Sequence, residues 1–291
     1  MLGLVACLTV VTNGQDLQGR YASYGDLILV HLPSAPFPHP LRAEGIRYRD
    51  SVYSAAEHYS DSTVAIFVPR GYQAGPTTDL VIHFHGWFNN VDSVLSQFKL
   101  IEQFCQSRKN AILVVPQGPR NAPDSFGGRL EDKDGFRSFV HDVLSVLVDK
   151  GIVHTDTPGK IVLSGHSGGY HAISYILLRG GLTKNIKEVY LFDALYGQTE
   201  KYTHWLENSD GRLLAIYTEN GGTKAETEAL MADLEGWEIP FLAKNEDQIA
   251  PVDLARNRIV LIYTSLGHND VIHVHETFRK FLEASVLGNI P

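Results

Sequence analysis

The chain has 291 residues, of which 44% are hydrophobic and 20% charged. This is enough apolar sequence for one large core, and the length favours a single domain. The formal net charge is −8 and there is no dense cluster of lysine and arginine. Nucleic acid and anionic membranes are therefore excluded as expected partners, because both require a basic surface.

Residues 1–14 are interpreted as the remnant of a signal sequence. The run Leu2–Val11 is apolar and uncharged, and it is too short to span a bilayer. No lysine or arginine precedes it, so an edge strand of the mature fold is the alternative. Leu4-Val5-Ala6-Cys7 also resembles a lipobox, which would make Cys7 a lipidated N-terminus. We predict a secreted or periplasmic protein, with a lipoprotein and a cytoplasmic protein as alternatives.

Short β-branched runs alternate with helical segments along residues 15–291, which we interpret as one domain. Most runs are continuously apolar, as in strands covered on both faces. The eight runs are Asp26–Leu32, Thr63–Val68, Leu80–Phe84, Ala111–Val115, Ile161–Ser164, Glu188–Phe192, Leu213–Tyr217 and Ile259–Tyr263. Helical spacing of apolar residues occurs at 91–101, 136–147, 173–177 and 278–282. This alternation predicts an α/β fold: a doubly wound, mostly parallel, eight-stranded sheet with helices on both faces.

Three further segments are predicted outside these strands and helical segments. Residues 33–47 are rich in proline and residues 118–133 are polar, so both are expected to be loops. The second follows a strand and could border a site at that edge. Residues 197–210 contain Tyr202, His204 and Trp205. They predict either a small cap over the site or a surface helix packed by its aromatic side chains.

Gly165, Ser167 and Gly169 form a G-x-S-x-G pattern between an apolar run and a helical segment. This context is typical of a nucleophile elbow, in which a strand turns into a helix within a few residues. The two glycines are expected because the chain doubles back closely there. The turn pushes the Ser167 hydroxyl out of the sheet, so Ser167 is the predicted nucleophile.

A serine nucleophile needs a base within hydrogen-bond reach and an acid that orients this base. His268 follows the eighth run, in a loop that opens at the same sheet edge as Ser167. Two acids end neighbouring strands: Asp193 after the sixth run and Glu219 after the seventh. Asp193 directly follows an apolar run, which indicates a buried carboxylate, whereas Glu219 precedes a glycine-containing turn. We choose Asp193 and keep Glu219 as the alternative.

The third predicted strand ends in His83-Phe84-His85-Gly86-Trp87. The backbone N–H groups of Trp87 and Gly168 are the predicted oxyanion-hole donors. The Trp87 indole and His166 are assigned to substrate binding. His83 and His85 could alternatively be a metal pair completed by Asp193 or His268, but no third ligand stands at a recognisable metal-site spacing. We therefore predict no metal.

The order Ser167, Asp193 or Glu219, then His268, together with eight strands, resembles the α/β-hydrolase superfamily over residues 26–287. The resemblance implies carboxylic ester hydrolysis without a cofactor. His85-Gly86-Trp87 is similar to the superfamily's oxyanion loop in its single-glycine form, which is typical of members that act on medium or bulky acyl groups. The superfamily usually carries its acid after strand seven, the position of Glu219, while Asp193 after strand six matches a known variant.

The predicted function is hydrolysis of a small-molecule or polymeric ester through an acyl-enzyme intermediate. An amidase or peptidase would use the same residues, and a non-catalytic binding protein could share the fold. The sequence leaves the acyl group, the alcohol and the oligomeric state open.

Overall fold

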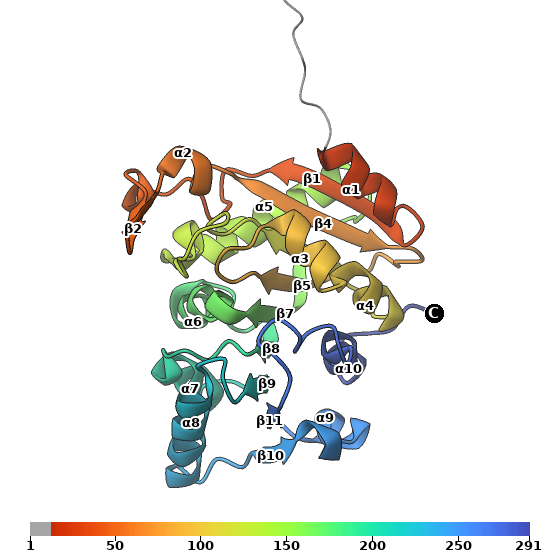
Figure 1. The fold of residues 1–291 in the computed structure, drawn as a ribbon. Coiled ribbons are helices and arrows are strands. Elements are labelled where there is room, and N and C mark those ends of the chain that lie inside the picture. Colours follow the sequence, from red (N-terminus) through yellow and green to blue (C-terminus); the bar gives the residue numbers. More distant parts are fainter. Residues whose placement is uncertain (1–12) are drawn as a thin grey trace, which may run out of the picture.

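The computed structural model describes residues 13–291 and places most strands in one sheet (Figure 1). The predicted signal-sequence run Leu2–Val11 lies outside the described residues. The strands are β1 (Gly25–His31), β2 (Ile46–Tyr48), β3 (Ser51–Tyr53), β4 (Thr63–Pro69), β5 (Thr78–Phe84), β6 (Ile112–Pro116), β7 (Pro158–His166), β8 (Ile186–Phe192), β9 (Arg212–Thr218), β10 (Leu242–Asn245) and β11 (Ile259–Thr264). The α-helices are α1 (Asn13–Tyr21), α2 (Ala55–His58), α3 (Val91–Gln97), α4 (Leu100–Gln106), α5 (Gly135–Asp149), α6 (Tyr170–Arg179), α7 (Thr199–Glu207), α8 (Lys224–Gly236), α9 (Pro251–Arg256) and α10 (Thr277–Glu283).

The main sheet has nine strands in the order β1-β4-β6-β5-β7-β8-β9-β11-β10. Strand β4 pairs antiparallel with β1 and β6, and the other pairs are parallel. All eight predicted runs are strands of this sheet, which confirms the doubly wound class. The predicted number of strands was wrong by one. Strand β10 has only four residues and lies half-exposed at the edge, so it carries no continuous apolar run.

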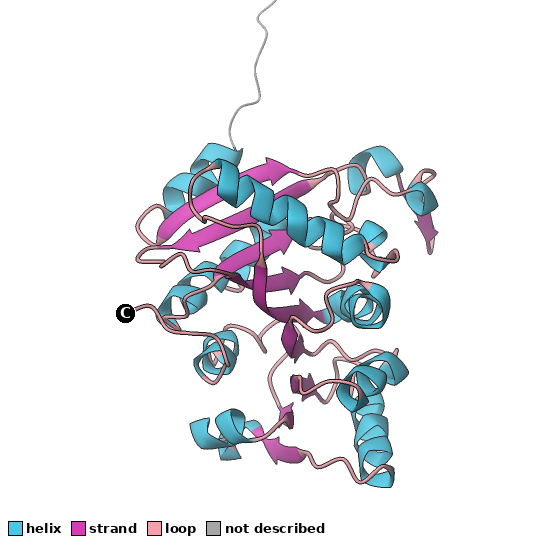
Figure 2. Ribbon diagram, turned by 180° about the vertical axis from the view of Figure 1, so that it is seen from behind, coloured by secondary structure: helices cyan, strands magenta, loops and turns pink. Residues whose placement is uncertain are grey.

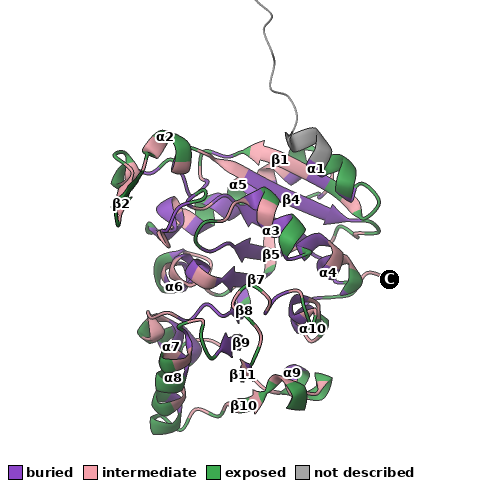
Figure 3. Cartoon of the chain, viewed as in Figure 1, coloured by how far each residue is buried: buried purple, intermediate pink, exposed green. Residues whose placement is uncertain are grey.

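Two apolar layers enclose the sheet because successive side chains of each strand point to opposite faces. In β7, Ile161 and Leu163 belong to one cluster and Val162 to the other. Helices α5, α6, α7 and α8 cover the first face, and α1, α3, α4, α9 and α10 cover the second (Figures 1 and 2). The central strands β4 to β9 and β11 are largely buried, while the outer helix faces are exposed (Figure 3). Within residues 13–291, the structure contains no helix with the length and apolarity that crossing a membrane requires.

The predicted helical segment 91–101 is two helices rather than one. Asn90 caps α3 as its position suggests, because its side chain accepts a hydrogen bond from the Ser93 N–H at 3.0 Å. Lys99 then adopts a left-handed conformation with φ of 50° and separates α3 from α4. Apolar spacing alone does not reveal this break, because both helices bury residues against the same sheet face.

The strand order places a crevice at the carboxyl ends of β5 and β7, which are neighbours. The chain leaves β5 toward α3 on one face and leaves β7 toward α6 on the other. Loops that diverge to opposite faces open a crevice between them, and such points bind ligands in α/β sheets. The predicted oxyanion loop and the predicted nucleophile therefore meet at this edge.

Candidate active site

Ser167 stands at a sharp turn between β7 and α6. Its φ is 52°, a left-handed conformation that costs free energy in a residue with a side chain and is typical of functional turns. The structure confirms that Gly165 and Gly169, the glycines before and after Ser167, have no room for a side chain. A Cβ on Gly169 would lie 2.5 Å from the Phe84 carbonyl oxygen, and one on Gly165 would lie 2.8 Å from Ile173 Cδ1. The segment is thus built as an elbow.

The loop after β5 passes directly over the nucleophile. A Cβ on Gly86 would lie 2.5 Å from Ser167 Cβ and 3.0 Å from its Oγ, so only glycine permits this approach. The buried ring of His85 holds the loop in place: Nδ1 donates to the Gly86 carbonyl, and Nε2 accepts from the Gly118 N–H, each at 2.9 Å. Burial lowers the pKa of His85, which agrees with a neutral ring.

Trp87 and Gly168, the predicted oxyanion donors, are adjacent in space. A Cβ on Gly168 would lie 2.8 Å from Trp87 Cδ1. The indole of Trp87 donates to Ser125 Oγ at 2.8 Å, and Ser125 belongs to the loop predicted to border the site. The two backbone N–H groups belong to the two segments that flank Ser167, which suits them to a negative charge that develops beside its Oγ.

Asp193 is buried and forms a hydrogen-bonded pair with the partly exposed His268. The Nδ1 of His268 lies 2.6 Å from Asp193 Oδ2. Asp193 also accepts hydrogen bonds from the Thr218 N–H at 3.1 Å, from the Thr218 hydroxyl at 2.9 Å and from the Thr223 hydroxyl. Burial alone would raise the pKa of Asp193, but these hydrogen bonds outweigh it and hold the pKa below its usual value. Asp193 is therefore an ionised carboxylate that holds a proton on Nδ1 and leaves Nε2 of His268 as the basic nitrogen.

Glu219, the alternative acid, points elsewhere. Its carboxylate pairs with Lys224 Nζ at 2.8 Å and accepts a hydrogen bond from the Tyr263 hydroxyl at 3.1 Å. Its side chain is 49% exposed, whereas that of Asp193 is 0% exposed. Of the two candidates, only Asp193 contacts His268.

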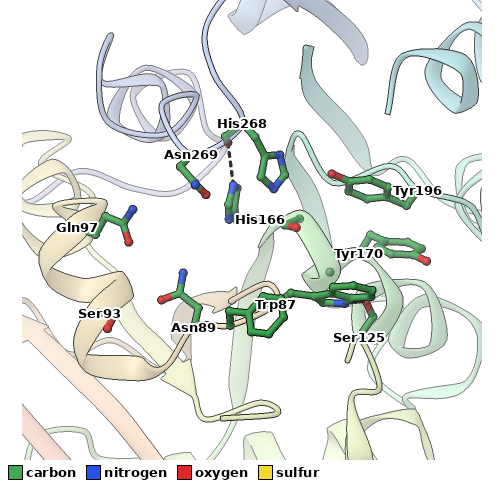
Figure 4. Close-up of a pocket in the computed structure, with 13 residues that line it drawn as sticks. Trp87, Asn89, Ser93, Gln97, Ser125, His166, Tyr170, Tyr196, His268 and Asn269 are labelled. Carbon is green, nitrogen blue, oxygen red and sulfur yellow. Dashed lines mark hydrogen bonds between the residues drawn. The ribbon is translucent and has the colours of Figure 1, made fainter. Parts of the chain in front are cut away.

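Ser167 and His268 line one pocket of about 630 Å³ at the carboxyl edge of the sheet (Figure 4). Trp87 and His166, both predicted to bind substrate, line it as well. Tyr196, which the sequence analysis did not single out, also lines this pocket. Its hydroxyl donates to the Gly221 carbonyl at 2.5 Å and lies close to the Ser167 side chain. Burial raises the pKa of Tyr196 to about 12, so it stays neutral.

The segment proposed as a cap, residues 197–210, contains helix α7. This helix packs beside α6, and its Tyr202 and Trp205 belong to the core cluster under that face. The pocket lining includes Tyr196, just before this segment, but no residue of α7. The structure thus favours a surface helix packed by its aromatic residues.

His166 lines the pocket and also contacts the loop that carries His268. Its ring is 2% exposed, and its Nε2 donates to the His268 backbone carbonyl at 3.0 Å. The centroids of the two imidazole rings lie 4.6 Å apart, and the Phe98 ring packs edge-on to His166 with a centroid distance of 4.9 Å. Burial lowers the pKa of His166 to about 3. The residue before Ser167 therefore ties the elbow to the loop that carries His268.

We expect His166→Phe to lower kcat/KM for ester hydrolysis by between about 10-fold and 100-fold, because a catalytic group misplaced by about 1 Å can cost that much. Phenylalanine keeps the ring packing but cannot donate to the His268 carbonyl. His166→Gln keeps a donor and should retain most of the activity. Steady-state rates and thermal unfolding of both variants test this; equal losses in both would show that the hydrogen bond is not what matters.

The hydrogen bonding of His85 disfavours the metal alternative at His83 and His85. Both ring nitrogens of His85 are occupied by protein partners, and His83 Nδ1 lies 2.9 Å from Ser164 Oγ. Within residues 13–291 there is no group of three or more His, Cys, Asp or Glu side chains that could hold a metal ion.

We expect ester hydrolysis to be unchanged after prolonged treatment with EDTA, because serine chemistry requires no metal. The activity is measured before and after dialysis against the chelator. A loss of activity that is reversed specifically by zinc would contradict this expectation and support His83 and His85 as metal ligands.

Comparisons with known proteins bear on the fold. No protein-family model matches the sequence, and no curated protein matches it. Solved structures do match. The fluorophosphonate-binding serine hydrolase F of Staphylococcus aureus covers 90% of this chain and 99% of its own, with a TM-score of 0.55 and 9% identity. A mutant feruloyl esterase module from Clostridium thermocellum, complexed with sinapinate, covers 90% of this chain and 88% of its own, with a TM-score of 0.54 and 10% identity. The chain has the α/β-hydrolase fold.

A third similar structure is the S-formylglutathione hydrolase FrmB of Staphylococcus aureus, which covers 90% of this chain and 98% of its own, with a TM-score of 0.54 and 8% identity. The resemblance stated from the sequence is thus confirmed for the fold. At sequence identities of 8–10%, the similarity does not assign functional residues. The roles of residues in this chain rest on the geometry of its own site.

The sequence analysis missed the residues that support the site. Thr218 and Thr223 hold Asp193, and Tyr196 contacts Ser167. Thr218 is the last residue of β9, directly before Glu219. This was a usable signal, because polar side chains at the ends of neighbouring parallel strands meet. Tyr196 lies in a turn without any distinguishing pattern, and only the tertiary structure brings it to the pocket.

Proposed function

We propose that this protein hydrolyses carboxylic esters with Ser167 as nucleophile, His268 as base and Asp193 as the orienting acid. The observation that carries the proposal is the hydrogen bond between the buried Asp193 carboxylate and His268, beside a serine held at an elbow. A base oriented in this way activates a hydroxyl that is otherwise a poor nucleophile.

The reaction follows from the positions of these groups. His268 Nε2 takes the proton from Ser167 Oγ as the oxygen attacks the ester carbonyl carbon. The carbonyl oxygen becomes an oxyanion, which the N–H groups of Trp87 and Gly168 stabilise. The C–O bond to the alcohol then breaks, and His268 returns its proton to the leaving oxygen. Water, deprotonated by His268, attacks the acyl-enzyme in the same manner and releases the acid.

Aromatic side chains indicate the size of the acyl group. Trp87, Tyr170 and Tyr196 line the pocket near Ser167 (Figure 4), and such rings bind flat or bulky apolar groups. One similar structure holds sinapinate in a feruloyl esterase module. This supports including esters of arylacrylic acids among the first substrates tested.

A fluorophosphonate probe tests the proposal, because only an activated serine reacts with it. We expect labelling of the wild-type protein at Ser167 and none of Ser167→Ala. A panel of p-nitrophenyl esters of increasing acyl size, run beside amide and peptide substrates, then identifies the bond that is cleaved. Labelling with amide cleavage alone would favour the amidase alternative, and absence of labelling would favour a non-catalytic binding protein.

A further inference from the structure

The active-site pocket has two chemically different sides (Figure 4). Aromatic residues Trp87, Tyr170 and Tyr196 lie on one side. On the other lie Asn89, Ser93, Gln97 and Asn269, which we call the amide arm. His268 stands between these two groups in Figure 4, and Phe88 and Ser125 also line the pocket. The pocket therefore offers mainly aromatic rings on one side and mainly uncharged polar groups on the other.

The pocket contains no formal charge that could bind an ionic substrate. None of its 13 lining residues is Asp, Glu, Lys or Arg, and the base His268 faces its carboxylate partner. A carboxylate, phosphate or ammonium group entering this pocket would lose water without gaining an ion partner, which is unfavourable. The net charge of −8 further disfavours anions.

The amide arm has unused hydrogen-bonding capacity. In the described part of the chain, Gln97 and Asn269 make no side-chain hydrogen bond, and Asn89 uses only its oxygen, which accepts from the Asn90 N–H at 3.2 Å. Each side-chain amide can both donate and accept. Hydroxyl groups also do both, so a hydroxylated ligand satisfies several amides at once, whereas an alkyl chain satisfies none.

The assignment of the acyl group decides which half of the ester meets the amide arm. In the proposed function the acyl group lies against the rings of Trp87, Tyr170 and Tyr196, on one side of the pocket. The alcohol is therefore assigned to the other side, where the amide arm lies.

We propose that the amide arm is a subsite for a neutral, polyhydroxylated alcohol, so that the substrates are uncharged esters of such alcohols. The inference rests on the proposed ester hydrolysis for its orientation, but the subsite itself is a binding property. It can therefore be tested apart from turnover.

The test compares three esters of one aryl acid: the propyl, the 2,3-dihydroxypropyl and the 2-carboxyethyl ester. Binding is measured by calorimetry with the Ser167→Ala protein, so that no turnover intervenes. We expect the dihydroxypropyl ester to bind about tenfold more tightly than the propyl ester, as two added hydrogen bonds would allow. The carboxyethyl ester should bind most weakly.

A matched pair of variants locates the effect. Gln97 and Gln106 are both the last residue of a helix, α3 and α4, and both are exposed. Only Gln97 lines the pocket. In the Ser167→Ala background, Gln97→Leu should reduce the preference for the dihydroxypropyl ester severalfold, and Asn269→Ala should do the same from the other side of the arm. Gln106→Leu should retain the preference.

Equal binding of the propyl and dihydroxypropyl esters, or tightest binding of the carboxyethyl ester, would overturn the inference. So would a preference that survives both Gln97→Leu and Asn269→Ala. The proposed function fails separately: if the wild-type protein hydrolyses none of the three esters while the binding order holds, the subsite stands and the ester hydrolase does not.

Discussion

Ser167→Ala is expected to lower kcat for ester hydrolysis by about 10⁴-fold to 10⁶-fold, the loss seen when a serine hydrolase loses its nucleophile. The residual rate comes from binding and the oxyanion donors, which the substitution leaves in place. Folding should be little affected, because alanine fits the same turn and the hydroxyl faces the pocket rather than the core.

Steady-state kinetics and thermal unfolding of the purified variant provide the measurement. Ser96→Ala is the control, since Ser96 is exposed on α3 and, among residues 13–291, its hydroxyl bonds only to backbone carbonyls of its own helix. A Ser167→Ala protein that keeps more than about one hundredth of the wild-type rate would rule out Ser167 as the nucleophile.

The second large effect is expected at Asp193. Asp193→Asn should lower kcat by about 10⁴-fold, the cost of losing the orienting carboxylate in a serine triad. All four groups around this carboxylate donate hydrogen bonds to it. An asparagine NH₂ group would face one of these donors, and opposite His268 it would favour the tautomer with the proton on Nε2, which cannot act as base.

Glu219→Gln is the matched control for this experiment. Glu219 pairs with Lys224 at the surface, so its loss should change kcat by less than about tenfold, as expected for a carboxylate outside the triad. The opposite pattern would move the acid to Glu219 and leave Ser167 and His268 in their roles. Two small losses would mean that another group orients His268.

The same substitution has a consequence for stability at low pH. The pKa of Asp193 is lowered in the folded protein, so its stabilising contribution is present above the unfolded pKa of about 3.9 and is lost as the pH falls through the folded pKa. Asp193→Asn should therefore unfold more easily than the wild type at neutral pH. Denaturant titrations should show this difference shrinking below about pH 4.

The sequence by itself determined eight of the nine strands of the central sheet, the elbow and the histidine loop. Strands buried on both faces need continuous apolar runs, and these are legible without a structure. The residues that leave such strands at their carboxyl ends gather at one edge, so Ser167 and His268 could be brought together from chain order alone.

The tertiary structure decided which acid contacts His268. Asp193 and Glu219 both directly follow parallel strands, and sequence position does not say where a side chain points. The deciding difference lies in partners distant along the chain: Thr218, Thr223 and His268 surround Asp193, while Lys224 and Tyr263 take Glu219. The half-exposed edge strand β10 and the break at Lys99 likewise escaped the sequence. A pattern of apolar residues indicates which side chains are buried. The pairing of an edge strand, and a turn between two helices that bury the same face, depend on backbone contacts, and these do not change the apolar pattern.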